Sequence, residues 1–75
     1  MAEDQFLKDY DLVWTVAYEF LELEEEVFQA LGVLLLTAAN NVERLNERER
    51  RESTVWNQAV NVATTYQAWK AEIGM

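Results

Sequence analysis

The amino-acid sequence predicts an all-α protein, and three observations support this fold class. Apolar residues recur with a period between 3.5 and 3.6 residues rather than with the alternation of a β-strand. The 75 residues include no Pro and only 2 Gly. Glu and Leu, which are good helix formers, are abundant. A chain of this length forms one domain, so we expect a single all-helical domain over residues 1–75.

The first predicted helix is long and runs from Phe6 to Leu45. From Phe6, alternate steps of four and three residues reach mostly apolar positions as far as Ala38. A second apolar row, in steps of seven, lies beside the first and widens it into one helical stripe. At about 1.5 Å per residue this helix is a rod of roughly 60 Å. Gly32 lies inside it and marks either a kink or a tight contact.

The second predicted helix follows a polar segment, residues 46–52, where the chain is expected to reverse direction. Because the segment lacks Gly and Pro, the alternative is a solvated helix end with Glu47–Arg51 and Arg48–Glu52 ion pairs. The same apolar frame returns after Ser53 and continues to Ile73. Ser53 or Thr54 is expected to cap the helix start, because a side-chain oxygen accepts from the free N–H groups of the first turn. Gly74 is expected to end the helix. Several β-branched residues disfavour helix here, but the longer apolar period outweighs them.

The favoured arrangement is a helical hairpin that dimerises into a four-helix-type bundle, because a last helix of roughly 30 Å covers only half of the first. The segment from Val27 to Val42 has almost no polar face, and a helix that is apolar all round is buried all round. We expect the dimer interface at five residues of this segment: Val27, Leu31, Leu34, Leu35 and Ala38. The alternative is a break near Glu24–Glu26, which gives a compact three-helix bundle. The hairpin ranks first because no Gly or Pro marks that break.

The absence of His and Cys excludes most catalytic and metal chemistry. Nucleophilic sites built on imidazole or thiolate, zinc and haem sites, and disulfides all need one of these residues. Only oxygen ligands remain, which suit Mg²⁺, Mn²⁺ or Ca²⁺. We therefore expect no cofactor. Other chains of this size commonly gain stability from disulfides or metals. Because neither is expected here, we expect oligomerisation to supply that stability.

Nothing in the sequence predicts a targeting or membrane-spanning segment. The first five residues are acidic, whereas a signal peptide begins with positive charge. The strongly apolar uncharged run at residues 27–42 spans 16 residues, which is shorter than the roughly 20 that a spanning helix needs. We expect a soluble cytoplasmic protein that does not associate with membranes.

The formal net charge of −8 is confined to the first third of the chain. Residues 1–26 hold nine acids and one base, whereas the remainder is neutral. Three of these acids, Glu19, Glu22 and Glu26, share one face of a continuous helix and form an acidic ridge, with Glu25 beside it. Such a run is commonly a solvated face. The functional interpretation is a surface that attracts a basic partner protein, with Tyr18 as an exposed anchor for the same partner.

The acidic ridge also suggests a nucleic-acid mimic, in which carboxylates imitate phosphates. Duplex DNA carries one charge per about 1.7 Å of axis, and the carboxylates reach a high density only over the first helix. Direct binding of nucleic acid is not expected, because the negative field of the protein repels phosphate.

Three arginines form a basic stripe at spacings of four and three: Arg44, Arg48 and Arg51. The interleaved glutamates predict a salt-bridged, exposed segment. The alternative is a site for an acidic segment of a partner, including the acidic ridge of a neighbouring copy.

Glu22, Glu25 and Glu26 form the one pattern that suggests an enzyme. Mg²⁺ takes one or two carboxylates plus substrate phosphates, and glutamates at this spacing would supply them. The pattern resembles the EExxE-type helix of the all-α nucleotide pyrophosphatases, and this resemblance implies a Mg²⁺-dependent nucleotide hydrolase completed by acids on a second helix. The second helix here offers two Asn, at positions 40 and 41, and Glu43 in place of a Glu/Asp pair.

The favoured function is therefore a non-enzymatic adaptor, inhibitor or regulatory subunit. It acts as a homodimer and presents its acidic helix to a partner protein with a basic or apolar surface. The Mg²⁺-dependent hydrolase and the acidic nucleic-acid mimic are the alternatives.

Overall fold

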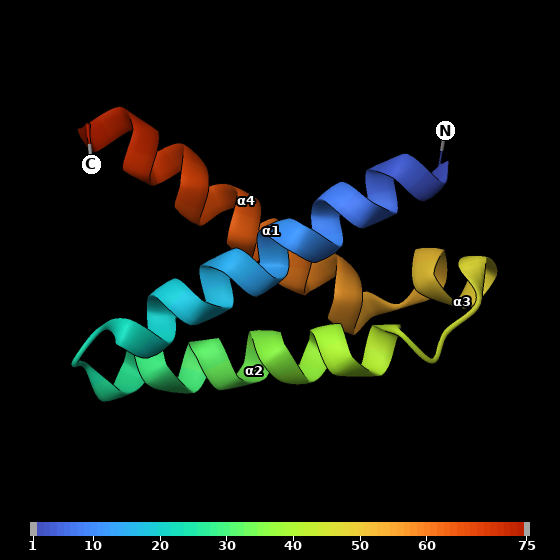
Figure 1. Ribbon diagram of the computed structural model, residues 1–75, viewed down its shortest axis with the longest axis horizontal. Coiled ribbons are helices and arrows are strands. Elements are labelled where there is room, and N and C mark those ends of the chain that lie inside the picture. Colours follow the sequence, from blue (N-terminus) through green and yellow to red (C-terminus); the bar gives the residue numbers. More distant parts are fainter. Residues whose placement is uncertain (1, 75) are drawn as a thin grey trace.

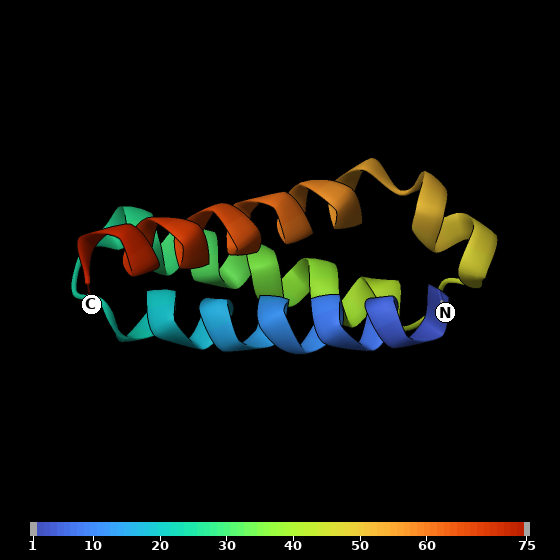
Figure 2. The same ribbon diagram turned by 90° about the horizontal axis from the view of Figure 1, so that it is seen from above.

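The computed structural model describes residues 2–74, which form four α-helices and no strand, so the all-α prediction is confirmed. The helices are α1 (Ala2–Glu22), α2 (Glu26–Val42), α3 (Glu47–Glu52) and α4 (Thr54–Ile73). The three long helices contact one another, and α1 and α4 lie across the same side of α2 (Figures 1 and 2). The α1–α2 turn and the end of α4 lie at one end of the molecule, and α3 lies at the other (Figure 1).

The single long first helix from Phe6 to Leu45 is wrong. The chain leaves helical geometry at residues 23–25 and folds back, so α1 and α2 pack side by side (Figure 1). The longest extent of the molecule is 35 Å, well short of the 60 Å rod. The break lies where the alternative arrangement placed it, near Glu24–Glu26, and the chain therefore contains three long helices rather than two.

Burial explains this break. Folding α2 back sets the ring of Phe28 5.7 Å from that of Phe20 and buries Leu35 to 4% exposure. Each large apolar side chain removed from water contributes roughly 1.5–3 kcal/mol, whereas the helix propensities of the turn residues differ by less than roughly 0.7 kcal/mol each. Tertiary burial therefore outweighs the local preference for a continuous helix.

The α1–α2 turn contains no Gly or Pro, and hydrogen bonds to the backbone of Leu23 stabilise it. The Leu23 N–H donates to the Phe20 carbonyl at 3.1 Å, and the Gln29 side-chain amide donates to the Leu23 carbonyl at 3.1 Å. Glu25 has extended geometry as the N-cap of α2. Glu26 occupies the first turn of α2, where its carboxylate interacts favourably with the helix dipole.

Gly32 is a site of close contact, and α2 runs through it without a break. A Cβ at this position would lie 2.9 Å from the backbone carbonyl oxygen of Ala17 and 2.9 Å from Cγ of Leu21. The missing side chain lets α2 approach α1 this closely. The close-contact alternative for Gly32 therefore holds, and the expected kink is not needed.

The polar segment is a turn followed by the short helix α3. Asn46 caps α3 in a capping box, in which its side chain accepts from the Glu49 N–H at 2.9 Å and the Glu49 carboxylate accepts from the Asn46 N–H at 3.1 Å. Ser53 caps α4 by accepting from the Trp56 N–H at 3.1 Å, and Gly74 ends α4 with φ 73°. Both predicted ends of the last helix are confirmed.

The core lies where the three long helices meet. Valines and Phe20 come from α1, whereas α4 contributes mainly alanines and Trp56. The buried apolar residues are Val13, Val16, Ala17, Phe20, Leu35, Ala38, Ala39, Val42, Trp56, Ala59 and Ala63. The small side chains of α4 keep it close to α1, but it touches α2 less extensively. One side of the α2–α4 junction consequently remains open.

Candidate functional site

An apolar groove of about 360 Å³ lies between α2 and α4. Four residues of α2 and five of α4 line it, and none of them is charged: Leu31, Leu34, Leu35, Ala38, Thr54, Val55, Gln58, Ala59 and Val62. Leu34 and Val55 stand on its rim with 64% and 65% of their surface exposed. Large apolar side chains gathered around a concave surface are typical of a protein-binding site.

The outer face of α2 extends this apolar surface. Val27 and Val33 are exposed to 67% and 54%, and no charged residue occurs between Glu26 and Glu43. The exposed positions of this face also include Ala30, Thr37, Asn40 and Asn41. Four helical turns therefore present a surface that contains no charged residue.

The predicted dimer-interface residues divide between the core and this surface. Leu35 and Ala38 are buried inside the chain at 4% exposure each, and Leu31 is half-buried. Leu34 and Val27 are exposed, and Val27 lies outside the groove lining. A second copy could therefore contact Val27 and Leu34 directly, but Leu35 and Ala38 only along the groove floor.

The α4 side of the groove was not predicted. Val55, Ala59 and Val62 stand out in the sequence as consecutive members of the apolar frame. The hairpin arrangement assigned them to the cover of the first helix, so their exposed edge was missed. The uneven contact of α4 with α1 and α2 produces this edge, and no local pattern encodes it.

The acidic ridge does not exist as a single helical face, because the break separates its members. Glu19 is on α1 and forms an ion pair with Lys70 of α4, with Oε2 and Nζ 2.9 Å apart. The hydrogen bond to Glu19 raises the pKa of the Lys70 ammonium above its usual value. The other members surround the α1–α2 turn with Glu24, and all four are exposed; we call Glu22, Glu24, Glu25 and Glu26 the acidic turn.

The proposed magnesium-binding glutamates are not brought together as a site. Among the described residues, no three carboxylates form a group that would hold a metal ion. Glu22 ends α1, whereas Glu25 and Glu26 begin α2 after the chain has bent. Glu43 instead accepts a hydrogen bond from the Tyr10 hydroxyl.

Tyr18 is 55% exposed on α1, the position expected of a surface anchor. Its ring stacks on that of Trp14 with centroids 5.7 Å apart and an interplanar angle of 28°. This stacking restricts the side chain before any partner arrives, which lowers the entropy lost on binding.

The basic stripe is split between a turn and α3. Arg44 follows α2 in the turn, and Arg48 and Arg51 lie on α3. Arg48 pairs with Glu52 at 3.2 Å, but the two side chains are 81% and 67% exposed, so this pair adds little stability. Within the described residues, Arg44 and Arg51 have no carboxylate within ion-pair distance.

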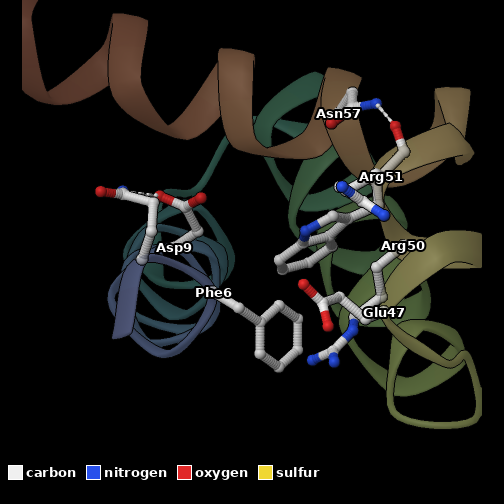
Figure 3. Close-up of a pocket in the computed structure, with 8 residues that line it drawn as sticks. Phe6, Asp9, Glu47, Arg50, Arg51 and Asn57 are labelled. Atoms are coloured by element: carbon white, nitrogen blue, oxygen red, sulfur yellow. Dashed lines mark hydrogen bonds between the residues drawn. The ribbon is translucent and has the colours of Figure 1, made fainter. Parts of the chain in front are cut away.

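A second cleft, of about 230 Å³, lies where α3 meets the starts of α1 and α4 (Figure 3). Phe6 and Trp56 form its apolar part, and the Arg50 guanidinium lies 3.9 Å from the centre of the Phe6 ring. Asn57 donates to the Arg51 carbonyl at 3.1 Å, as the dashed line in Figure 3 shows. The Arg50 and Asn57 side chains already interact within the chain and tie α3 to α1 and α4, so the apolar groove is the better candidate site.

Comparisons with protein families, curated proteins and solved structures return no match for this chain. Over residues 2–74, no helix is both long enough and apolar enough to cross a membrane. The groove rim and the acidic turn are exposed and take no part in the core of the described residues.

Proposed function

We propose that this protein is a small homodimeric interaction protein without enzymatic activity. A second copy occupies the apolar groove, and the acidic turn binds a partner protein that offers a basic surface. The observation that carries this proposal is the groove itself, an uncharged concave surface whose rim residues Leu34 and Val55 are about two-thirds exposed.

The available area supports a dimer of ordinary size. A stable interface buries about 800 Å² on each partner, and the chain exposes 5461 Å² in total. Such an interface would cover roughly a seventh of the surface. The groove, the outer face of α2 and the exposed rim of α4 together offer an uncharged, largely apolar region for it.

The acidic turn supports the second part of the proposal. The ion pairs of the described residues use Glu19 and Glu52, so the four carboxylates of the acidic turn have no cationic partner among those residues. Their charge is concentrated within five residues at one end of the molecule (Figure 1). A concentrated negative field speeds the approach of a basic partner and makes binding sensitive to salt.

Introducing a charge into the groove tests the dimer. We expect wild-type protein to sediment as a dimer and the variants Leu34→Asp and Val55→Asp to sediment as monomers, because a buried carboxylate without a partner is costly. Thr64→Asp adds the same charge at an exposed position of α4 outside the groove and should leave the dimer intact. A wild-type monomer at 100 micromolar would contradict the proposal.

Neutralising the acidic turn tests partner binding. Glu24→Gln/Glu25→Gln/Glu26→Gln should release proteins that the wild type retains from a cell extract, and retention by the wild type should fall as salt is added. The matched control, Glu47→Gln/Glu52→Gln/Glu72→Gln, removes the same number of charges elsewhere and should keep them. Equal retention by both triple variants would remove the acidic turn from the proposal.

The hydrolase alternative has a separate test. A magnesium site would raise the thermal midpoint in millimolar Mg²⁺ or Mn²⁺, since a ligand that binds the folded state stabilises it. We expect no rise, because the structure does not gather Glu22, Glu25 and Glu26. A rise that is lost in Glu22→Gln/Glu26→Gln would favour the enzyme.

A further inference from the structure

We infer that the two copies pair antiparallel along α2, about a twofold axis near Leu34, so that α2 of each copy lies in the groove of the other. This inference rests on the proposed homodimer and specifies its geometry. It follows from the uncharged face of α2, from the symmetry that a dimer of identical chains requires, and from the different charges at the two ends of that helix.

The face of α2 beside the groove is self-complementary around Leu34. Val27, Leu34 and Asn41 are spaced by seven residues, so they follow one line along the helix, and all three are exposed. In a twofold dimer each residue before the axis contacts the residue at the same distance beyond it. Val27 therefore faces Asn41 of the second copy, and Leu34 faces its own counterpart.

This register covers the exposed side chains of Val27 and Leu34 without burying a charge. The line from Val27 to Asn41 lies wholly between Glu26 and Glu43, which are the first charged residues on either side. A shift of the axis by two turns toward either end would carry one of these glutamates into the apolar interface. Burial of an unpaired carboxylate is strongly unfavourable, so the axis is confined to the middle of α2.

The charges at the two ends of α2 select the antiparallel orientation. The acidic turn precedes α2, whereas a charge-balanced segment of four Arg and four Glu, residues 43–52, follows it. Parallel pairing would place the two acidic turns, eight carboxylates in all, against each other. Antiparallel pairing instead places Glu24 beside Arg44 and Glu25 beside Glu43 of the other copy, so each acidic turn meets one acid and one base rather than four acids. Arg44 has no carboxylate within ion-pair distance among the described residues and is therefore available for this pairing.

This orientation has a functional consequence for the proposed partner. The two acidic turns lie at opposite ends of the paired α2 helices, about 25 Å apart for helices of this length. One nearby arginine does not neutralise four carboxylates, so each turn stays negative. The dimer therefore presents two separate acidic surfaces, and it suits a partner that offers two basic surfaces related by a twofold axis.

Disulfide trapping tests the orientation, and the cysteine-free chain makes the result easy to read. Single-cysteine variants Val27→Cys, Asn41→Cys and Leu34→Cys are equilibrated separately in a glutathione buffer. Val27→Cys and Asn41→Cys are also mixed, with a mass tag on one of the two so that the mixed disulfide can be recognised. A disulfide needs Cα atoms about 4.4–6.8 Å apart, whereas antiparallel pairing separates two copies of residue 27 by about 21 Å. Thr64→Cys, an exposed position outside the groove, reports random collision.

We expect Leu34→Cys to form a homodisulfide, and Val27→Cys to link to Asn41→Cys in a mixture but not to itself. Homodisulfides of both Val27→Cys and Asn41→Cys in a dimeric protein would overturn the antiparallel orientation and leave the proposed dimer standing. If the protein is a dimer but residues 27, 34 and 41 give no more disulfide-linked product than Thr64→Cys, the α2 interface is overturned. A monomer by sedimentation would overturn the proposed function together with this inference.

Discussion

At the scale of single residues, Gly32 sets the distance between α1 and α2. In an ordinary exposed helix position, Gly→Ala stabilises by about 1 kcal/mol. Here the new Cβ would meet the Ala17 carbonyl oxygen at 2.9 Å, and forced overpacking costs about 1–3 kcal/mol. The gain in helix propensity offsets part of this cost, so we expect Gly32→Ala to lower the free energy of unfolding by up to about 2 kcal/mol, measured by urea denaturation.

The sign of this change distinguishes close contact from helix propensity. Ala30→Gly at an exposed position of the same helix is the matched control, and it should cost about 1 kcal/mol through propensity alone. If propensity governed both sites, Gly32→Ala would instead stabilise the protein. A stabilising result would mean that α1 and α2 can separate at no cost.

Ionisation of the Tyr10 phenol makes the stability of the fold depend on pH in the alkaline range. The hydrogen bond to the Glu43 carboxylate, followed by burial, raises the pKa of the Tyr10 phenol above its usual value near 10. The folded state thus holds this proton more tightly than the unfolded chain. The stability that it contributes is complete below about pH 10 and is lost as the pH rises through the folded-state pKa.

We therefore expect the free energy of unfolding to fall as the pH rises above about 10. The variant Tyr10→Phe should show a smaller fall, because its side chain has no proton to lose. Urea denaturation at several pH values between 8 and about 12 measures both slopes. Identical slopes would show that the Tyr10–Glu43 contact does not persist in solution.

At the scale of elements, the start of α4 depends on one hydroxyl. The Ser53 side chain accepts from the Trp56 N–H at 3.1 Å, and Trp56 is buried against α1. Loss of an N-cap hydroxyl typically costs about 1 kcal/mol. We expect Ser53→Ala to lower the free energy of unfolding by about that amount, and Thr54→Ala, at the first helical position, to change it little.

The α1–α2 turn shows where element prediction fails. The local sequence Leu23-Glu24-Glu25 favours helix, and the apolar frame continues through it without a slip. The break arises because Phe28, Leu35 and their neighbours gain more by packing on α1 than three residues lose by leaving the helix. The ends of α4 were predictable because Ser53 and Gly74 act locally, through a cap and a left-handed conformation.

At the scale of the whole molecule, the proposed dimer predicts that stability depends on protein concentration. Association stabilises the folded state by mass action, so the thermal midpoint of the wild type should rise with concentration, by about 3–5 °C for each tenfold increase. Leu34→Asp should show no such dependence. Calorimetry over a hundredfold range of concentration measures both, and a constant wild-type midpoint would argue against self-association.

The candidate site was predictable only in part. Leu31 and Leu34 were expected in an interface because residues 27–42 are apolar all round, and both line the groove. Leu35 and Ala38 were assigned to the same interface, but they face the interior of their own chain at 4% exposure. The direction in which each apolar residue faces depends on which helices of the chain cover α2, and periodicity does not report that.

The sequence by itself determined the helical fold class, the caps of the last helix, the uncharged middle segment and the confinement of the net charge to residues 1–26. These properties are local, since each depends on residues within a few turns of one another. Only the tertiary structure decided that the chain bends at residues 23–25, that Glu19 pairs with Lys70, and that an apolar groove stays open between α2 and α4. Those outcomes depend on the surface that distant segments bury together, and this long-range term exceeds the local preferences it overrides.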